Sequence, residues 1–162
     1  MNDSFILRDR KWRETNERVT LSSYAMLSEE SKGRFKKEDQ DPFRTVFERD
    51  RDRIIHSKTF RRLKHKTQVF INPDGDHFIT RMTHTLNVTQ IGRSIAKTLG
   101  LNPDLTEAIC LGHDVGHSPF GHTGEEVLND MLDGGWSHSE NSVKMLSICL
   151  LYTSDAADEE AS

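Results

Sequence analysis

The sequence predicts an all-α fold, a bundle of amphipathic helices with clear starts and stops. Two observations carry this prediction. Apolar residues recur at helical spacing through most of the chain after residue 40, and capping residues, glycines or prolines separate the periodic stretches. The exception surrounds Asn72-Pro73-Asp74-Gly75, where short apolar runs flank a turn sequence. We therefore expect a helical bundle with one small β-hairpin near residues 68–80.

The composition narrows the class of protein. The 162 residues suit one domain, and with 34% hydrophobic and 30% charged residues the chain is polar without being typical of a disordered segment. Its apolar runs are a few residues long, so we expect no transmembrane helix, no secretory signal and no membrane partner. Two cysteines, Cys110 and Cys149, lie in no CxxC pattern, which favours a cytoplasmic location.

Charge is spread unevenly along the chain. Residues 1–66 hold 18 Lys and Arg against 12 Asp and Glu, whereas residues 67–162 hold 4 against 14. Such halves can fold together around an anionic ligand and its cations, or the basic half can simply be a solvated helix face. The net charge of −4 argues against a general nucleic-acid coat protein. Binding of single-stranded nucleic acid through residues 44–66 stays open.

The first predicted helix follows a polar N-terminal segment, residues 1–40, that has little periodicity. The dipeptide Asp41-Pro42 is typical of an N-cap with proline at the first helical position. Apolar residues then recur at roughly helical spacing as far as Ile55. The pattern continues, after an expected bend, with Phe60 and Leu63.

Two further helices are predicted after the hairpin. The first runs from about Arg81 to Leu99, where Gly100 ends it, and the second starts at Asn102-Pro103-Asp104. Each has one stripe of residues at helical spacing that we expect to face the core. The stripes are His84, Val88, Ile91 and Ile95 on the first helix, and Leu105, Ile109 and His113 on the second.

Glycines and capping residues divide the next part of the chain. The segment Gly112–Gly121 contains three glycines and one proline, and we expect it to break the second helix. Thr123 with Glu126, and then Ser137 with Glu140, each suit a capping box at the start of a further helix.

The last residues, 149–162, differ in character from those before them. The stretch from Cys149 to Glu159 resembles the translation of a sequencing-library adapter, and the amphipathic pattern stops after Leu151. We expect a non-native tail on a truncated reading frame, with a genuine acidic tail as the alternative. The expected organisation is thus a polar segment over 1–40, a partial helical domain over 41–148, and this tail.

Six of the eight histidines lie between residues 77 and 138, and their placement indicates a metal site. His84 belongs to the stripe of one predicted helix, and His113-Asp114 ends the next. Imidazole and carboxylate groups suit divalent metals, and burying three such groups without a partner would be costly. Each alone is more typical of an ordinary half-buried or surface residue, so the combination carries the prediction.

Four blocks in this order resemble the deoxyguanosine triphosphate triphosphohydrolases, a branch of the HD metal-dependent phosphohydrolases. They are RDRIIHSKTFRRLKHKTQVF, RMTHTLNVTQIGR, LGHDVGHSPFGHTGEEVLN and GWSHSENSVKML, beginning at Arg51, Arg81, Leu111 and Gly135. The resemblance covers about residues 35–148 and implies an HD-domain helical bundle. It also implies hydrolysis of a deoxynucleoside triphosphate, dGTP or another dNTP, to the deoxynucleoside and inorganic triphosphate.

The resemblance implies roles for individual residues as well. It assigns ligands of a divalent metal, Mg²⁺ or Mn²⁺, an acid–base group beside the α-phosphate, and residues that contact the substrate. The ligands are His84, His113 and Asp114; the catalytic residues are His122, Glu125 and His138; the substrate-binding residues are Arg62, Lys66, Gln68, Arg81 and His117. For the first three substrate-binding residues, a solvated helix face is an equal alternative.

One departure from the family pattern matters. The HD motif ends with a distant Asp on a later helix that completes the metal site. After Asp114 this chain offers two Asp residues that come too early, Asp130 and Asp133, and two in the expected tail, Asp155 and Asp158. We therefore expect the fourth ligand to be missing and this polypeptide to be impaired, even where the intact protein is an enzyme.

Three functional hypotheses remain open at this stage. The first is a metal-dependent dNTP triphosphohydrolase, homo-oligomeric in its intact form. The second is another HD phosphohydrolase, such as a nucleotidase or cyclic-nucleotide phosphodiesterase, which would release a different product. The third is a non-catalytic nucleotide- or nucleic-acid-binding fragment that assembles with full-length partners.

Overall fold

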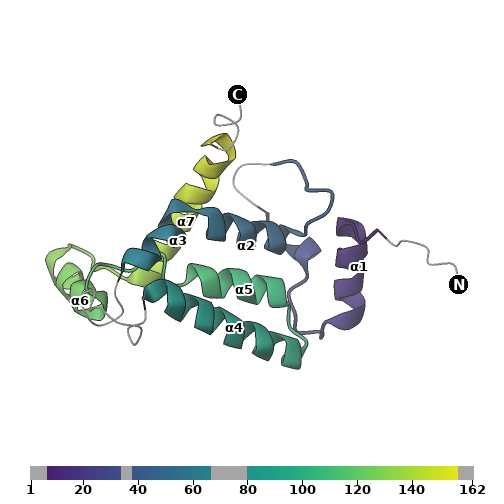
Figure 1. Ribbon diagram of the computed structural model, residues 1–162, viewed down its shortest axis with the longest axis horizontal. Helices are drawn as coiled ribbons and strands as arrows, with labels where there is room; N and C mark the ends of the chain where they lie inside the picture. The colour runs from purple at the N-terminus through teal and green to yellow at the C-terminus, as the bar shows by residue number, and fades with distance from the viewer. Residues whose placement is uncertain (1–6, 34–37, 67–79, 157–162) are drawn as a thin grey trace, which may run out of the picture.

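The computed structural model is helical over the residues that it describes, 7–33, 38–66 and 80–156, with side chains in the last helix described as far as residue 147. No strand occurs in these ranges, which agrees with an all-α fold. The predicted hairpin near residues 68–80 lies, except for Thr80, outside them. Figure 1 shows the elements in chain order: α1 (Arg10–Thr20), η1 (Ser28–Glu30), α2 (Val46–His56), α3 (Lys58–Arg62), η2 (Leu63–His65), α4 (Arg81–Leu99), α5 (Pro103–Gly112), α6 (Gly121–Met131) and α7 (His138–Ala156).

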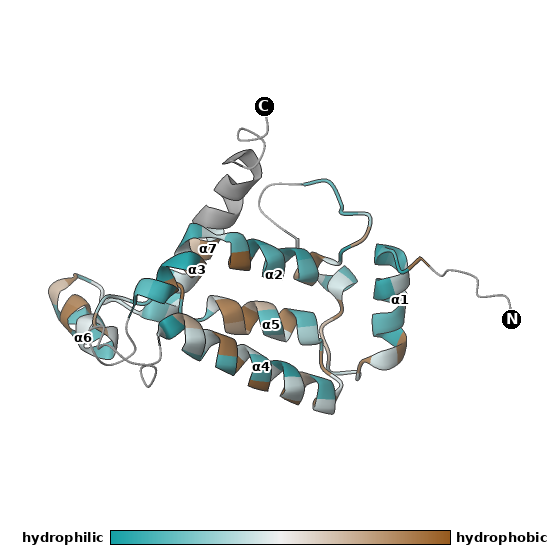
Figure 2. Ribbon diagram, viewed as in Figure 1, coloured by the Kyte–Doolittle hydropathy of each residue, from teal (hydrophilic) through white to brown (hydrophobic). Residues whose placement is uncertain are grey.

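Three helices form the central layer, in which α5 lies between α2 and α4 (Figure 1). α7 packs against α2, α3 and α5. Figure 2 shows apolar residues along α5 and mostly hydrophilic ones along α2, as expected for the central and outer helix of a layer. The buried core gathers where α5 meets its neighbours: Ile54, Phe60, Leu63, Ala108, Leu111 and Val115, with Met82 and Leu146 packed against them.

The start of α2 differs from the prediction. Asp41 does not cap it; its side chain accepts the backbone N–H groups of Phe43 and Arg44 in a local turn. The helix begins four residues later, because Thr45 and Glu48 form a complete capping box. The predicted bend is present at Ser57, which separates α2 from α3 and caps the latter.

The buried faces of α4 and α5 also differ from the predicted stripes. Ile91, Ile95 and Ile109 keep more than half of their surface exposed, so their assignment to the core is wrong. A Cβ added to Gly92 would come within 2.8 Å of the Cys110 sulfur, which shows how closely the two helices approach. Small side chains permit that approach, and the helix contact decides which face is buried. The buried residues of α4 are Arg81, Thr85, Thr89 and Ala96.

The start of α6 is a further difference. No capping box forms at Thr123 and Glu126. The helix begins at Gly121, after Phe120, which adopts the left-handed conformation with φ of 65° and makes no side-chain cap. A bulky residue with positive φ is strained, and this strain lies in the turn that carries several of the predicted site residues.

The polar N-terminal segment contains a helix, α1, that its weak periodicity did not predict. Asp9 caps this helix by accepting the N–H of Trp12. The segment is tied to the central layer by an ion pair of 2.6 Å between Arg13 and Glu48. No helix within the described residues is long and apolar enough to cross a membrane.

We predict that Gly116→Ala destabilises the fold, because a Cβ at this position would collide with the backbone of Asn141 and Ser142 in α7. Overpacking of this kind costs about 1–3 kcal/mol, to be measured as the free energy of unfolding in a urea titration. Gly112→Ala is the matched control, since its Cβ would meet first the flexible end of the Leu146 side chain. A larger loss at Gly112 than at Gly116 would contradict the close backbone contact.

Candidate metal and acid–base site

Two helices bring the predicted metal ligands together. His84 lies in the first turn of α4, and His113 and Asp114 directly follow α5. One candidate ligand atom from each residue lies within 4.8 Å of the other two. The two imidazole centroids are 5.8 Å apart. We call these three residues the HD triad.

Hydrogen bonding fixes the tautomer of His113. Its Nδ1 is 2.7 Å from the carbonyl oxygen of Cys110. Because a carbonyl oxygen only accepts, Nδ1 of the neutral ring carries the proton. The lone pair is therefore on Nε2, which lies 3.5 Å from Oδ1 of Asp114. Two electron-rich atoms that face each other in this way suit a cation bound between them.

The two carboxylate oxygens of Asp114 face different neighbours. Its Oδ2 accepts a hydrogen bond of 3.0 Å from Nη1 of Arg81, and both side chains are almost completely buried. A buried carboxylate needs a partner of this kind. The other oxygen, Oδ1, remains on the side of His113. The pair leaves one carboxylate oxygen for a metal.

These donors fit a divalent ion that accepts nitrogen and oxygen ligands, such as Mn²⁺ or Mg²⁺. Within the described residues no further histidine, cysteine or carboxylate joins the HD triad. Asp130 and Asp133, the two later aspartates outside the expected tail, belong to neither of the groups that could hold a metal ion. The missing fourth ligand stays a prediction.

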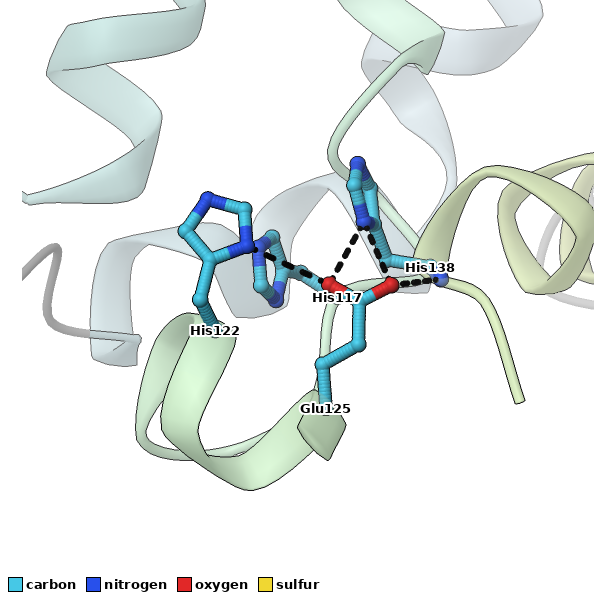
Figure 3. A group of neighbouring side chains, drawn as sticks. All are labelled: His117, His122, Glu125 and His138. Atoms are coloured by element: carbon cyan, nitrogen blue, oxygen red, sulfur yellow. Dashed lines mark hydrogen bonds and ion pairs between the residues drawn. The ribbon is translucent and has the colours of Figure 1, made fainter. Parts of the chain in front are cut away.

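A second cluster surrounds the turn after α5, and Figure 3 shows its four side chains converging. His117 comes from the turn, His122 and Glu125 from the start of α6, and His138 from the first residue of α7. One candidate ligand atom of each lies within 4.8 Å of the others. The ring of His138 stacks on that of His117, with centroids 4.5 Å apart. We call this group the histidine cluster.

Glu125 is the shared acceptor of the histidine cluster. Its carboxylate is 2.9 Å from Nδ1 of His138, 3.3 Å from Nδ1 of His122, and accepts the backbone N–H of His138 (Figure 3). Burial acts to raise the pKa of Glu125, but the hydrogen bonds from His138 and His122 outweigh it and lower the pKa to about 2. The carboxylate is therefore ionised at neutral pH. The His122 side chain is 78% exposed, whereas that of His138 is 27% exposed.

His117 is the buried member of the cluster. Burial, together with the positive charge of Arg81, lowers the pKa of its imidazole to about 4. The ring is thus neutral at pH 7. Its Nδ1 is buried and has no hydrogen-bond partner among the described residues.

α7 holds the turn between the two groups in place. Ser142 Oγ accepts the N–H of Gly116 at 2.9 Å, and the Asn141 side chain donates to the Gly116 carbonyl at 2.7 Å. Neither residue was among the predicted site residues. A serine and an asparagine on a helix carry no sequence signal for such a role, since both are common on exposed helix faces.

The predicted substrate-binding residues differ in their contacts and in their exposure. Lys66 donates to the carbonyl oxygen of His117 at 2.6 Å, and burial, with the nearby charges of Arg81 and Arg62, lowers its pKa. Arg62 is exposed on α3. Gln68 lies outside the described residues. The Arg81 side chain donates a hydrogen bond to Asp114, so this arginine supports the HD triad.

Comparisons with known proteins indicate the family of the chain. The HD domain family model matches residues 81–156, which include the HD triad and the histidine cluster. A deoxyguanosinetriphosphate triphosphohydrolase-like protein of Caldanaerobacter subterraneus is 64% identical over 128 residues, 79% of this chain. Proteins of the same name from Clostridium tetani and Desulfatibacillum aliphaticivorans are 59% and 55% identical over 85% and 80% of it. The chain belongs to the deoxyguanosinetriphosphate triphosphohydrolase-like family.

The three family members are much longer than this chain. The matches cover 38%, 40% and 37% of their lengths, so the chain spans about two fifths of the relatives that it matches. The HD domain match extends to residue 156 and so includes the first residues of the expected tail, 149–162. α7 likewise runs to Ala156.

We predict that His113→Ala lowers the affinity of the chain for Mn²⁺ by at least about tenfold, because it removes the nitrogen that faces Asp114. The fraction of free Mn²⁺ in a titration, read by electron paramagnetic resonance, measures this. His56→Ala is the matched control, since His56 is exposed at the end of α2 and belongs to neither group. Equal affinity of the two variants would exclude His113 as a ligand.

A second prediction concerns pH and the metal-free chain. Because the pKa of His117 is about 4 in the fold and about 6.5 when unfolded, the unfolded state binds the extra proton first. The free energy of unfolding should therefore fall as pH decreases from 6.5 to 4, by up to about 3 kcal/mol. Urea titrations in a chelator measure it. His117→Gln should lose this part of the pH dependence, and an unchanged profile would contradict the assignment.

Proposed function

We propose that the intact protein is a metal-dependent dNTP triphosphohydrolase, which hydrolyses dGTP or another dNTP to the deoxynucleoside and inorganic triphosphate. The observation that supports this best is the placement of the HD triad and the histidine cluster on either side of one turn, Asp114 to His117. A metal-binding group and an acid–base group are the two components that phosphoester hydrolysis needs. The names of the relatives point to the same substrate class.

The HD triad fits a metal through the free lone pair of His113 and the free oxygen of Asp114. A divalent ion held there would supply a Lewis acid that neutralises charge on a phosphoryl oxygen. Arg81 contributes by orienting Asp114 through their buried hydrogen bond of 3.0 Å.

Proton transfer is assigned to His122. Its Nδ1 is held by Glu125, which leaves Nε2 directed away from the carboxylate and its side chain largely exposed to an incoming substrate. A protonated imidazole at this position can donate its proton to the leaving 5′ oxygen. The ionised Glu125 stabilises the imidazolium before that transfer, as a carboxylate does in other histidine–carboxylate pairs.

Positive charge beside the turn favours a polyanionic substrate. Burial lowers the pKa of Lys66, and the nearby charges of Arg81 and Arg62 lower it further. A triphosphate bound near them would offset this mutual repulsion. We assign Lys66 and Arg62 to substrate binding, together with Gln68, and His117 to the wall of the phosphate site; His138 positions the Glu125 carboxylate.

For the chain as given we propose an incomplete enzyme. In this proposal residues 41–148 form a partial HD domain, residues 1–40 an N-terminal polar segment that contacts it through Arg13 and Glu48, and residues 149–162 a non-native tail. Three metal ligands without the fourth carboxylate should bind Mg²⁺ or Mn²⁺ weakly and support little turnover. The homo-oligomer is proposed for the intact protein alone.

A non-catalytic nucleotide-binding fragment is the second candidate. The specific observation that favours it is the HD triad itself, which gains no additional carboxylate within the described residues. Such a fragment would bind dGTP through Lys66, Arg62 and the histidine cluster but release no product.

We predict that restoring the missing region restores activity that depends on His122. The test protein is a chimera in which the 128 matched residues of this chain replace the corresponding residues of the Caldanaerobacter relative. In it, His122→Ala should lower triphosphate release from dGTP by ~10²–10⁴-fold. Mn²⁺ affinity should stay nearly unchanged. Ion chromatography of the products gives the rate, and His56→Ala serves as the exposed-histidine control.

The other outcomes of this assay separate the alternatives. Release of pyrophosphate or phosphate in place of triphosphate would indicate another HD phosphohydrolase. A parallel loss of Mn²⁺ in His122→Ala would make His122 a ligand. Binding of dGTP without any product would support the non-catalytic fragment.

A further inference from the structure

The histidine cluster has a composition that acid–base chemistry alone does not require. It brings three imidazoles and one carboxylate together from a turn and two helices, with one candidate ligand atom of each within 4.8 Å of the others. One of these rings, that of His117, is 97% buried, yet its Nδ1 has no hydrogen-bond partner among the described residues. A buried imidazole nitrogen without a partner is unfavourable unless a ligand binds it.

We propose that His117, His122, Glu125 and His138 form a second metal site, separate from the HD triad, that selects a transition-metal ion such as Zn²⁺ or Co²⁺. Imidazole nitrogen is a preferred ligand of these ions, whereas Mg²⁺ prefers oxygen and retains its water. Three nitrogens and one carboxylate oxygen complete a four-coordinate site.

The geometry needs only a small closure to reach metal–ligand distances. Ligand atoms around a four-coordinate Zn²⁺ at ~2.0–2.1 Å are about 3.3 Å from one another, compared with the upper bound of 4.8 Å here. The exposed His122 can rotate inward, since its side chain is 78% accessible and its contact with Glu125 is the longest in the cluster. His117 and His138 already stack on each other, so they provide the fixed part of the site.

Occupancy would have a chemical consequence that rests on the proposed function. A transition-metal ion would take the Glu125 carboxylate and the His122 imidazole, the groups that proton transfer needs. Metal binding at the histidine cluster and acid–base catalysis would therefore exclude each other. The binding itself can be measured without any turnover, so a failure of the proposed activity leaves this test intact.

The experiment is a Co²⁺ titration of the whole 162-residue chain, followed by bound metal per chain and by visible absorption, which is intense when cobalt is four-coordinate. We expect two Co²⁺ per chain. Glu125→Gln and His138→Ala should each lose one Co²⁺ and the intense absorption. His113→Ala should lose the other Co²⁺ and keep that absorption. His56→Ala should keep both.

Glu125→Gln is chosen because glutamine has the shape of glutamate and so keeps the fold. Circular dichroism of each variant checks its helix content. Binding of a single Co²⁺ that His113→Ala removes would overturn the proposal. So would visible absorption that is unchanged in Glu125→Gln and His138→Ala. Absence of any Co²⁺ binding by the whole chain would overturn it as well.

Discussion

The buried ion pair between Arg81 and Asp114 is the interaction on which the arrangement of the site depends. It joins the first residue of α4 to the turn after α5, and both side chains are almost fully withdrawn from water. Removing one partner of such a pair leaves an uncompensated buried charge, at a cost of about 3–5 kcal/mol. Because His84 follows Arg81 by one turn and His113 precedes Asp114, the same pair brings both imidazoles together.

The packing of α7 on the turn after α5 depends on a glycine. Gly116 lets the backbone of α7 approach so closely that Asn141 and Ser142 satisfy its N–H and carbonyl groups. α7 begins with His138, so this contact also determines where that imidazole meets Glu125. The HD triad and the histidine cluster are therefore two sides of one packed turn. A change in the turn would affect both.

Local signals in the sequence predicted the boundaries of α4 correctly, because a glycine in the left-handed conformation, Gly100, ends the helix. The same local signals failed where a contact between helices decides which residues are buried. Periodicity assigned Ile91 and Ile95 to the core, but α5 packs against the smaller side chains of α4 and leaves both isoleucines exposed. Family blocks predicted the histidines of the candidate site. The partner of Asp114 and the role of Ser142 required the fold, since both contacts join segments more than twenty-five residues apart.

The two imidazoles on Glu125 show how position can divide roles between identical side chains. His138 contacts the carboxylate through its ring and its own backbone N–H, stacks on His117 and is mostly buried. His122 has one longer contact and a side chain that is 78% exposed. A group that transfers a proton must reach the substrate, whereas a group that orders the carboxylate must not move. Under the proposed function, this geometry favours His122 for proton transfer and His138 for positioning, a division that their equal residue type and shared carboxylate would not reveal from sequence.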